Sequence, residues 1–293
     1  MMKENLSLVI LAGGASTRMK KQLHSSVLIY KDENSQANNR SKALISIDKN
    51  NRPILDYLLY NAKKAGYTTI YIITGEDNFL FKSFYGNENQ GNVFNGLSIN
   101  YAIQYIQKDR DKPFGTADAL YQAMTQYPIL KTVSFTVCNS DNLYSIDAFE
   151  FLRNTDSYPN SLISYDRDYL QFSMDRISRF ALLSIDENNY LKSIIEKPEL
   201  DVFSSFKDSQ GKLRVSMNIF RFNGEFLFSY LENCPINKTR NEKELPTALL
   251  NMINDSPNST ITIPLAEHVP DLTSKEDINI LKQYVKNIDI SSF

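Results

Sequence analysis

Apolar and polar residues follow two distinct patterns along the first half of the chain. Residues 6–12 are almost continuously apolar and precede Gly13 and Gly14, which is typical of a strand covered on both faces. At 53–66, apolar residues recur at helical spacing between a proline and a glycine, which predicts a helix. The alternation continues with predicted strands at 68–75, 98–105 and 132–142 and a predicted helix at 115–124. This order is typical of βα units around a mainly parallel sheet.

The second half has a different pattern. Strand-like segments follow one another with short Asn, Asp and Gly turns at 161–166, 178–186, 190–198 and 214–222. Such turns favour antiparallel strands packed beside the first sheet. The chain then returns to a predicted helix at 243–253, a strand at 260–266 and a last helix from Ser274. We therefore expect one large α/β domain with an antiparallel extension.

The segment 31–41 interrupts these patterns. Its sequence, KDENSQANNRS, is polar and rich in Asn and Ser, a composition typical of loops. Because it follows soon after the two glycines, we expect it to be a mobile flap over whatever those glycines bind.

Composition and charge narrow the class of protein. The 293 residues include 32 Lys and Arg against 34 Asp and Glu, and the formal net charge of −2 argues against generic binding to nucleic acid or to an anionic membrane. Cys138 and Cys234 are far apart and lack metal-ligand spacing, so neither a disulfide nor a structural zinc site is indicated. No window approaches the about 18 apolar residues of a membrane span, and the start of the chain lacks a leader cleavage site. A cytoplasmic protein is expected.

A glycine turn follows the first predicted strand. Gly13 and Gly14 have no Cβ, so backbone N–H groups can approach phosphate oxygens, and a helix beginning there would add its positive dipole end. Arg18 adds a permanent cation. The spacing matches neither the dinucleotide-binding glycine pattern nor the Walker pattern. Taken alone, these residues are explained equally well by an ordinary strand-to-helix turn.

Two carboxylates are candidate metal ligands. Asp141 follows a predicted buried strand, at the edge where open α/β sheets bind ligands, and carboxylate oxygens suit Mg²⁺. Asp is also an ordinary residue after a strand, so this position alone favours a structural role. Asp271 is a similar isolated case, which gains weight only if the fold brings it beside Asp141.

Two further segments contain candidate binding residues. Glu196 and Lys197 end a predicted strand at Pro198, which fixes the exit of the chain and could present both side chains to a polyhydroxylated ligand. A surface ion pair is the commoner explanation of such a pair. Gly115 and Thr116 begin a predicted helix, where the simplest interpretation of Thr116 is an N-cap.

Taken in order, these segments resemble the sugar-phosphate nucleotidyltransferase superfamily, the pyrophosphorylases that make nucleotide sugars, and a bacterial branch of it in particular. LAGGASTRM at 11–19 resembles the family signature, and Lys42 in SKALISI resembles the lysine that follows it. The other matches are PFGTADAL at 113–120, NSDN at 139–142, EKP at 196–198 and VPDLTSKEDI at 269–278. Their collinearity over nearly the whole chain outweighs the simpler explanation of each segment.

The resemblance implies a Rossmann-like fold of the GT-A type, with a mainly parallel sheet flanked by helices and a smaller antiparallel extension on the sugar side. It implies a single domain over 1–293, with a nucleotide-binding half at about 1–150 and a sugar-phosphate-binding half at 151–293. The implied reaction joins an NTP to a sugar 1-phosphate and releases pyrophosphate, with Mg²⁺ as cofactor. No nucleic-acid or membrane partner is implied, and a homo-oligomer is left open.

The same resemblance assigns roles to individual residues. Arg18 and Lys42 are assigned to catalysis on the phosphates, and Asp141 and Asp271 to the metal. The residues assigned to nucleotide binding are Leu11, Ala12, Gly13, Gly14, Arg110, Gly115 and Thr116. Those assigned to the sugar phosphate are Glu196, Lys197 and Asn218.

The chain departs from the family pattern at three places. Ser16 stands where most members have a third glycine, and Arg110 stands where many carry a base-reading Gln, which leaves the base open. The segment 19–41 between Arg18 and Lys42 is longer than usual, so Lys20, Lys21 and Lys31 compete with Lys42 for the lysine role. We prefer Lys42 because the apolar residues that usually follow that lysine come after it.

Two alternative functions remain at this stage. A molybdenum-cofactor or polyol-phosphate type nucleotidyltransferase also resembles LAGGASTRM followed by KALI, whereas EKP and the chain length favour the sugar branch. A non-catalytic nucleotide-sugar-binding homologue would keep the fold without turnover. The joint presence of Arg18, Lys42, Asp141 and Asp271 argues against it, because a degenerate homologue would usually have lost at least one.

Overall fold

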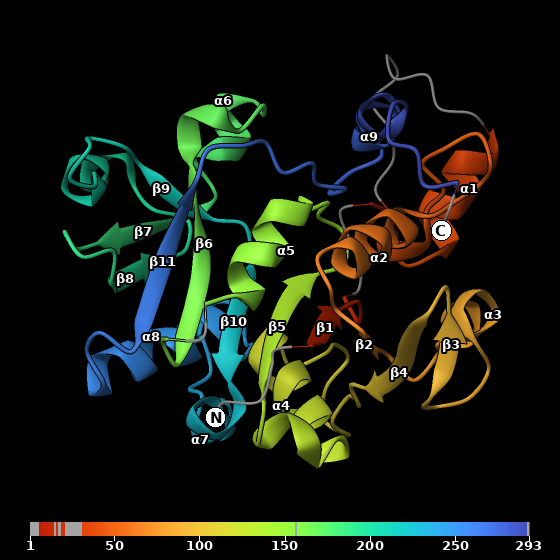
Figure 1. The fold of residues 1–293 in the computed structure, drawn as a ribbon, viewed down its shortest axis with the longest axis horizontal. Coiled ribbons are helices and arrows are strands. Elements are labelled where there is room, and N and C mark those ends of the chain that lie inside the picture. Colours follow the sequence, from red (N-terminus) through yellow and green to blue (C-terminus); the bar gives the residue numbers. More distant parts are fainter. Residues whose placement is uncertain (1–5, 15, 17–18, 21–30, 156, 292) are drawn as a thin grey trace.

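A computed structural model describes residues 6–14, 16, 19–20, 31–155, 157–291 and 293 (Figure 1). Strands from both halves of the chain join in one sheet of eleven strands. The confirmed α/β architecture begins with four parallel strands in the order β4 (Leu97–Ile103), β2 (Thr69–Thr74), β1 (Ser7–Leu11) and β5 (Ser134–Asn139). The short β3 (Asn92–Phe94) pairs antiparallel with β4.

The antiparallel extension of this sheet comes from the second half of the chain. Next to β5 lie β10 (Ile219–Asn223) and then β6 (Asn160–Asp166), each antiparallel to its predecessor. β11 (Thr260–Leu265) runs beside β6 in parallel, as Figure 1 shows. The edge is formed by β9 (Arg214–Ser216), β7 (Ala181–Ile185) and β8 (Leu191–Ile195).

Helices cover both faces of the sheet. One face packs against α2 (Ile54–Lys64) and α5 (Ile146–Arg153), and the other against α4 (Thr116–Gln126), α7 (Gly224–Glu232) and α8 (Leu245–Asp255). The other helices are α1 (Lys31–Asn39), α3 (Phe79–Tyr85), α6 (Met174–Ile177) and α9 (Asp277–Val285). Short 3₁₀ segments lie at Lys42–Leu44, Pro128–Lys131, Arg167–Tyr169 and Leu200–Phe206.

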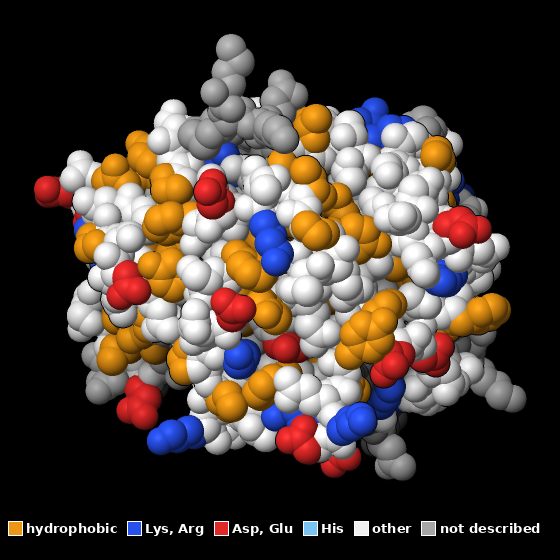
Figure 2. Space-filling model, turned by 90° about the horizontal axis from the view of Figure 1, so that it is seen from below, with side chains coloured by type: hydrophobic (Ala, Val, Ile, Leu, Met, Phe, Trp, Pro, Cys, Tyr) orange, Lys and Arg blue, Asp and Glu red, His pale blue; other side chains and the backbone are white. Residues whose placement is uncertain are grey.

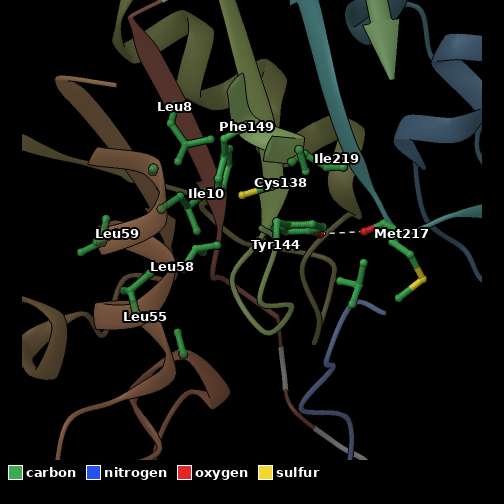
Figure 3. Close-up of a cluster of buried hydrophobic side chains, with 14 of the residues drawn as sticks. Leu8, Ile10, Leu55, Leu58, Leu59, Cys138, Tyr144, Phe149, Met217 and Ile219 are labelled. Carbon is green, nitrogen blue, oxygen red and sulfur yellow. Dashed lines mark hydrogen bonds between the residues drawn. The ribbon is translucent and has the colours of Figure 1, made fainter. Parts of the chain in front are cut away.

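The alternation of side chains along β1 explains this two-sided core. Leu8 and Ile10 point to the face of α2 and α5, whereas Val9 points to the opposite face, and all three are fully buried. Each such side chain contributes about 1.5–3 kcal/mol relative to an exposed one. Figure 3 shows Tyr144 among the first cluster, where its hydroxyl donates to the backbone oxygen of Met217 at 2.7 Å. This bond ties the segment after β5 to the turn between β9 and β10.

The predicted single strand at 214–222 is wrong in one respect, because the structure divides it into β9 and β10. Asn218 lies between them with φ of 57°, a left-handed conformation that interrupts a strand. The two pieces also have different neighbours, since β9 pairs with β6 and β7 whereas β10 pairs with β5 and β6.

The predicted loop at 31–41 is also wrong, because most of it forms α1. This helix lies beside α9 in Figure 1, and Lys282 of α9 forms an ion pair with Glu33. Ala37 is fully buried, and Gln36 accepts a hydrogen bond from the backbone N–H of Ser46 at 3.0 Å. The helix is therefore stabilised by contacts distant in sequence, which outweigh its loop-like composition.

The last helix begins at Asp277 rather than at Ser274. The two residues are nevertheless in contact, since the Asp277 carboxylate accepts the backbone N–H of Ser274 at 2.7 Å. Elsewhere on the surface, Figure 2 shows a face on which Lys and Arg are interspersed with Asp and Glu among other side chains. Among the described residues, no helix combines the length and the apolar character needed to cross a membrane.

Candidate functional site

Two adjoining hollows lie at the edge of the sheet where the parallel strands end. We call the one of about 450 Å³ the glycine-side hollow and the one of about 990 Å³ the extension-side hollow. Both lie where open α/β sheets bind ligands, outside the carboxyl ends of their strands. Six residues line both of them: Leu11, Thr116, Asn139, Asp141, Arg240 and Glu242.

The glycine turn forms one wall of the glycine-side hollow. β1 ends at Leu11, and the N–H of Ala12 still bonds to the backbone oxygen of Ile73 at 2.8 Å. A Cβ on Gly13 would lie 3.4 Å from Gln104 Oε1, whereas a Cβ on Gly14 would meet nothing within 4 Å. Protein packing therefore does not require a glycine at 14, and the open space beside it is available to a ligand.

Two residues that line the hollows have unusual backbone conformations. Among the described residues other than Gly and Asn, positive φ occurs at Ser16, with 54°, and at Lys197, with 48°. Such conformations cost about 1–3 kcal/mol and concentrate at binding sites. Ser16 thus has a positive φ at the position where the resemblance implies a third glycine, and the loop accepts its Cβ. Arg18 lies outside the described residues.

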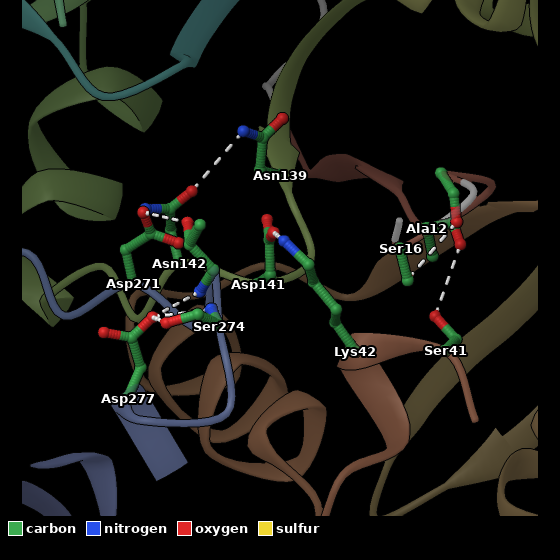
Figure 4. A network of polar contacts seen from close by, with 12 residues as sticks. Ala12, Ser16, Ser41, Lys42, Asn139, Asp141, Asn142, Asp271, Ser274 and Asp277 are labelled. Carbon is green, nitrogen blue, oxygen red and sulfur yellow. Dashed lines mark hydrogen bonds and ion pairs between the residues drawn. The ribbon is translucent and has the colours of Figure 1, made fainter. Parts of the chain in front are cut away.

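Lys42 and Asp141 meet between the glycine turn and β5. Figure 4 shows the Lys42 side chain pointing at the Asp141 carboxylate, with Nζ 2.7 Å from Oδ2. The two side chains are 11% and 22% exposed, so water screens the attraction between their charges only weakly. Both residues nevertheless line the glycine-side hollow. Of the competing lysines, Lys20 is exposed and does not line either hollow, and Lys21 and the side chain of Lys31 lie outside the described residues.

Asp271 lies beside Asp141, as its interpretation as a metal ligand requires. Figure 4 shows the two aspartates on neighbouring segments. These segments pair antiparallel through Asn142 and Asp271, and the N–H of Leu272 donates to the Asp141 backbone oxygen at 2.8 Å. Burial raises the pKa of the Asp271 carboxyl, and the negative charge of Asp141 raises it further. A cation between the two carboxylates would relieve this repulsion.

Arg176 holds Asp271 in place and was missed by the sequence analysis. Its guanidinium bonds to Asp271 Oδ2 at 2.8 Å and to Asp277 Oδ1 at 2.6 Å, and it stacks on the Phe172 ring at 4.4 Å. Thr273 Oγ1 donates to the same Oδ2 of Asp271 at 2.8 Å. A lone arginine in a polar segment carries no local signal, so only the fold identifies it.

The donor set around Asp141 and Asp271 fits Mg²⁺ when phosphate oxygens complete it. The described residues contain no group of three or more His, Cys, Asp or Glu that could hold a metal ion by themselves. Mg²⁺ is commonly held by one or two carboxylates together with substrate phosphates and waters. Within the described residues, the side-chain donors to Asp141 and Asp271 all bond to Oδ2, so Oδ1 of each is left for a cation.

Gly115 lines the glycine-side hollow, and Thr116 lines both hollows. Gly115 has φ of 100°, and a Cβ there would lie 2.3 Å from the backbone oxygen of Lys243, so only glycine fits. The Thr116 hydroxyl accepts the backbone N–H of Leu245 at 2.9 Å. The interpretation of Thr116 as the N-cap of its own helix is therefore wrong, since Gly115 occupies that position and Thr116 caps the start of α8.

Arg110 is not among the residues that line either hollow. Its guanidinium stacks on the Phe114 ring at 3.9 Å and donates to the backbone oxygen of Asn241 at 2.5 Å. Gln104 lines the glycine-side hollow instead, and its Nε2 donates to the backbone oxygen of Gly115 at 3.0 Å. Its position directly after a parallel strand is a sequence signal that could have identified it.

The extension-side hollow gathers the remaining candidates. Glu196, Lys197 and Asn218 all line it, together with Arg240, which the sequence analysis missed. Arg240 forms an ion pair with Glu244, whose side chain is 7% exposed. The structure thus brings the predicted residues of the second half to one hollow and adds a cation at its border with the other hollow.

Comparison with known proteins gives a consistent result. The model of the family described as nucleotidyl transferase matches residues 37–261. A glucose-1-phosphate adenylyltransferase from Photobacterium profundum is 23% identical over 76% of this chain and 50% of the relative. One from Francisella tularensis subsp. novicida is 25% identical over 63% of this chain and 43% of the relative. The chain spans about half the length of the curated relatives that it matches.

A solved structure supports the fold. It comes from Bacillus anthracis, is described as a glucose-1-phosphate thymidylyltransferase and contains sucrose. The TM-score is 0.67 at 19% identity, with 97% of this chain and 96% of the other covered. At this identity the likeness is evidence for the shared architecture alone.

Proposed function

Because the chain belongs to the nucleotidyl transferase family, we propose that it joins an NTP to a sugar 1-phosphate and releases pyrophosphate. The observation that carries this proposal is the position of Asp141, which borders both hollows beside Lys42 and Asp271. Two anionic substrates can meet there, one in each hollow. Relatives named for reactions of glucose 1-phosphate support the same class of acceptor.

The reaction needs no protein nucleophile. An oxygen of the sugar phosphate attacks the α-phosphorus of the NTP, a P–O bond forms, and the P–O bond to pyrophosphate breaks. The protein contributes by holding the two anions in line and by stabilising the charge that develops on phosphorus. Bound Mg²⁺ would supply Lewis-acid stabilisation of that charge, and Asp141 and Asp271 are the residues that would hold it.

The residues of the glycine-side hollow would bind the nucleotide. The open backbone at Gly13 and Gly14 would receive phosphate oxygens, and Lys42 would leave Asp141 partly or wholly to contact them. Gln104 and the turn at Gly115 lie on the same hollow and would flank the base. The expected role of Arg18 on the triphosphate remains part of the proposal.

The residues of the extension-side hollow would bind the sugar phosphate. Glu196 can accept hydrogen bonds from sugar hydroxyls, while Lys197 and Arg240 offer cations to the phosphate. Asn218 presents its side chain from the left-handed turn between β9 and β10. The acceptor phosphate would then lie near Asp141, where the attack must occur.

Pyrophosphate release tests the proposal directly. The protein is incubated with each of ATP, CTP, GTP, UTP and dTTP against a panel of sugar 1-phosphates, with Mg²⁺ or with EDTA. We expect one NTP and sugar pair to release pyrophosphate, and EDTA to stop it. Turnover of polyol phosphates alone would support the alternative branch, and NTP binding without turnover on any acceptor would support a non-catalytic homologue; either outcome rejects the proposal.

A further inference from the structure

The segment Asn237–Glu244, which carries Arg240 and Glu242, is attached to the turn at Gly115. The N–H of Lys243 donates to the backbone oxygen of Phe114 at 2.7 Å, and the N–H of Ala117 donates to that of Lys243 at 3.0 Å. These two bonds lie on either side of Gly115, which has no room for a Cβ against Lys243. The turn and the segment are therefore in direct backbone contact.

The Thr116 hydroxyl completes this attachment. It accepts the N–H of Leu245, the first residue of α8, at 2.9 Å and so connects the end of the segment to the start of α4. A threonine hydroxyl that caps a helix distant in sequence is specific to this chain's tertiary structure. Nothing in the proposed reaction requires this bond, which raises the question of its role.

The attached segment is cross-linked internally. The N–H of Asn237 donates to the backbone oxygen of Glu242 at 2.8 Å, and its side-chain Nδ2 donates to Glu244 Oε2 at 2.8 Å. Glu244 also holds Arg240 in an ion pair. Because the segment is cross-linked at both ends, a constraint at Lys243 and Leu245 is transmitted to Arg240 as a shift of the whole segment.

We infer that Thr116 is a positioning residue that couples the two hollows, so that a nucleotide bound against the turn at Gly115 fixes Arg240 for the sugar phosphate. The inference rests on the proposed function, since it takes the glycine-side hollow as the nucleotide site. A nucleotide that orders the turn also orders the attached segment. The sugar phosphate then loses less free energy to ordering the segment when it binds, so it binds more tightly. The coupling is reciprocal, so the sugar phosphate also strengthens nucleotide binding.

Amide hydrogen exchange on the full-length protein tests the coupling before any sugar is added. Each of ATP, CTP, GTP, UTP and dTTP is added with Mg²⁺, and exchange is followed in peptides that cover 104–119 and 237–244. In the wild-type protein we expect the NTP that binds to slow exchange in both peptides, by about fivefold or more in 237–244. Slowing confined to 104–119 would overturn the inference while leaving the proposed nucleotide site intact.

Two substitutions at Thr116 separate coupling from simple packing. Thr116→Val removes the acceptor at nearly constant volume but leaves the two backbone bonds of Lys243, so we expect slowing at 104–119 to persist while slowing at 237–244 falls by about half or more. Thr116→Ser keeps the hydroxyl and should restore the wild-type pattern. Thr125→Val makes the same change at an exposed position of α4, where the hydroxyl donates to the backbone oxygen of Tyr121 in its own helix, and should have no effect.

The remaining outcomes are also decisive. If Thr116→Val leaves the slowing at 237–244 unchanged, the nucleotide orders that segment by direct contact or through the backbone bonds of Lys243, and the role of Thr116 is rejected. If no NTP slows exchange in either peptide, the proposed nucleotide site fails, and the inference fails with it. If Thr116→Val does not fold, Thr116→Ala takes its place because it also removes the acceptor, and undiminished slowing at 237–244 in that variant rejects the role of Thr116.

Discussion

The two hollows are built in different ways. The glycine-side hollow includes glycine backbone, with Gly14 open to the space and Gly115 in a conformation that no other residue adopts without strain. The extension-side hollow is lined by side chains that form ion pairs. Arg176 pairs with Asp271, and Arg240 pairs with Glu244. Backbone walls depend on where glycine stands in the sequence, whereas paired charges depend on what the fold brings together.

Asp141 belongs to both hollows, so its substitution should have the largest effect. Asp141→Asn keeps the size of the side chain but removes the charge that would hold Mg²⁺, and we expect turnover to fall by about a thousandfold or more. Pyrophosphate release and a thermal melt measure activity and folding together. Asp255→Asn, the same change at an exposed residue at the end of α8, should retain full activity. Near-normal turnover in Asp141→Asn would reject the metal assignment.

Lys42 tests the glycine-side hollow by its charge. Lys42→Met removes the cation next to Asp141, and we expect turnover to fall by about a hundredfold through lost phosphate contacts. Lys20→Met removes an exposed lysine from the segment between Arg18 and Lys42 and should change turnover less than about twofold. If Lys20→Met lowers turnover more than Lys42→Met does, then Lys20 rather than Lys42 is the lysine that contacts the phosphates.

Arg176 tests the paired charges of the extension side. Arg176→Met leaves Asp271 and Asp277 without their partner, and we expect the free energy of unfolding to fall by about 2–4 kcal/mol. Arg179→Met, three residues later, breaks an ion pair with Asp175 that is mostly exposed and should be almost neutral. Urea unfolding measures the free energy of unfolding of both variants. Equal values would show that the ion pair between Arg176 and Asp271 does not stabilise the fold.

Gly115 tests the backbone wall. Gly115→Ala places a Cβ 2.3 Å from the Lys243 oxygen at a φ of 100°, and we expect a loss of about 2–3 kcal/mol of unfolding free energy. Gly211 also has positive φ, but a Cβ there meets nothing within 4 Å, so Gly211→Ala should cost about 1 kcal/mol. If the two variants are equally stable in urea, the close approach to Lys243 is not a constraint on the fold.

The stability of the protein should depend on pH through Asp56 in α2. Burial raises the pKa of Asp56 in α2 from 3.8 to about 6, although the Tyr85 hydroxyl donates to its carboxylate at 2.8 Å. The folded state thus binds an extra proton between these pH values, and the unfolding free energy should fall by about 1–2 kcal/mol as pH rises from 4 to 6. Asp56→Asn should remove this part of the pH dependence, which urea unfolding at several pH values would show. If the unfolding free energy changes with pH by the same amount in the wild type and in Asp56→Asn, Asp56 is not the source of this pH dependence.

Prediction from sequence succeeded where a local pattern was sufficient. The apolar run before Gly13 specified β1, and the helical spacing at 53–66 specified α2, because strands and helices buried by a sheet must carry the corresponding apolar residues. It failed at α1, whose polar sequence has no apolar stripe and whose stability comes from α9. It also failed at Asn218, because the break between β9 and β10 reflects a change of neighbouring strand.

For the candidate site, the sequence by itself singled out the glycine turn, the lysine after it and the two aspartates, since each stands in a motif and the motifs follow one another in the order of the family. Only the tertiary structure decided that Asp271 lies beside Asp141, that Arg176 and Arg240 line the hollows, and that Arg110 does not. It also decided that the Thr116 hydroxyl serves α8 rather than its own helix. The physical reason is range: a turn or a strand depends on neighbouring residues, whereas an ion pair or a hydrogen bond between distant segments depends on which strands and helices pack together.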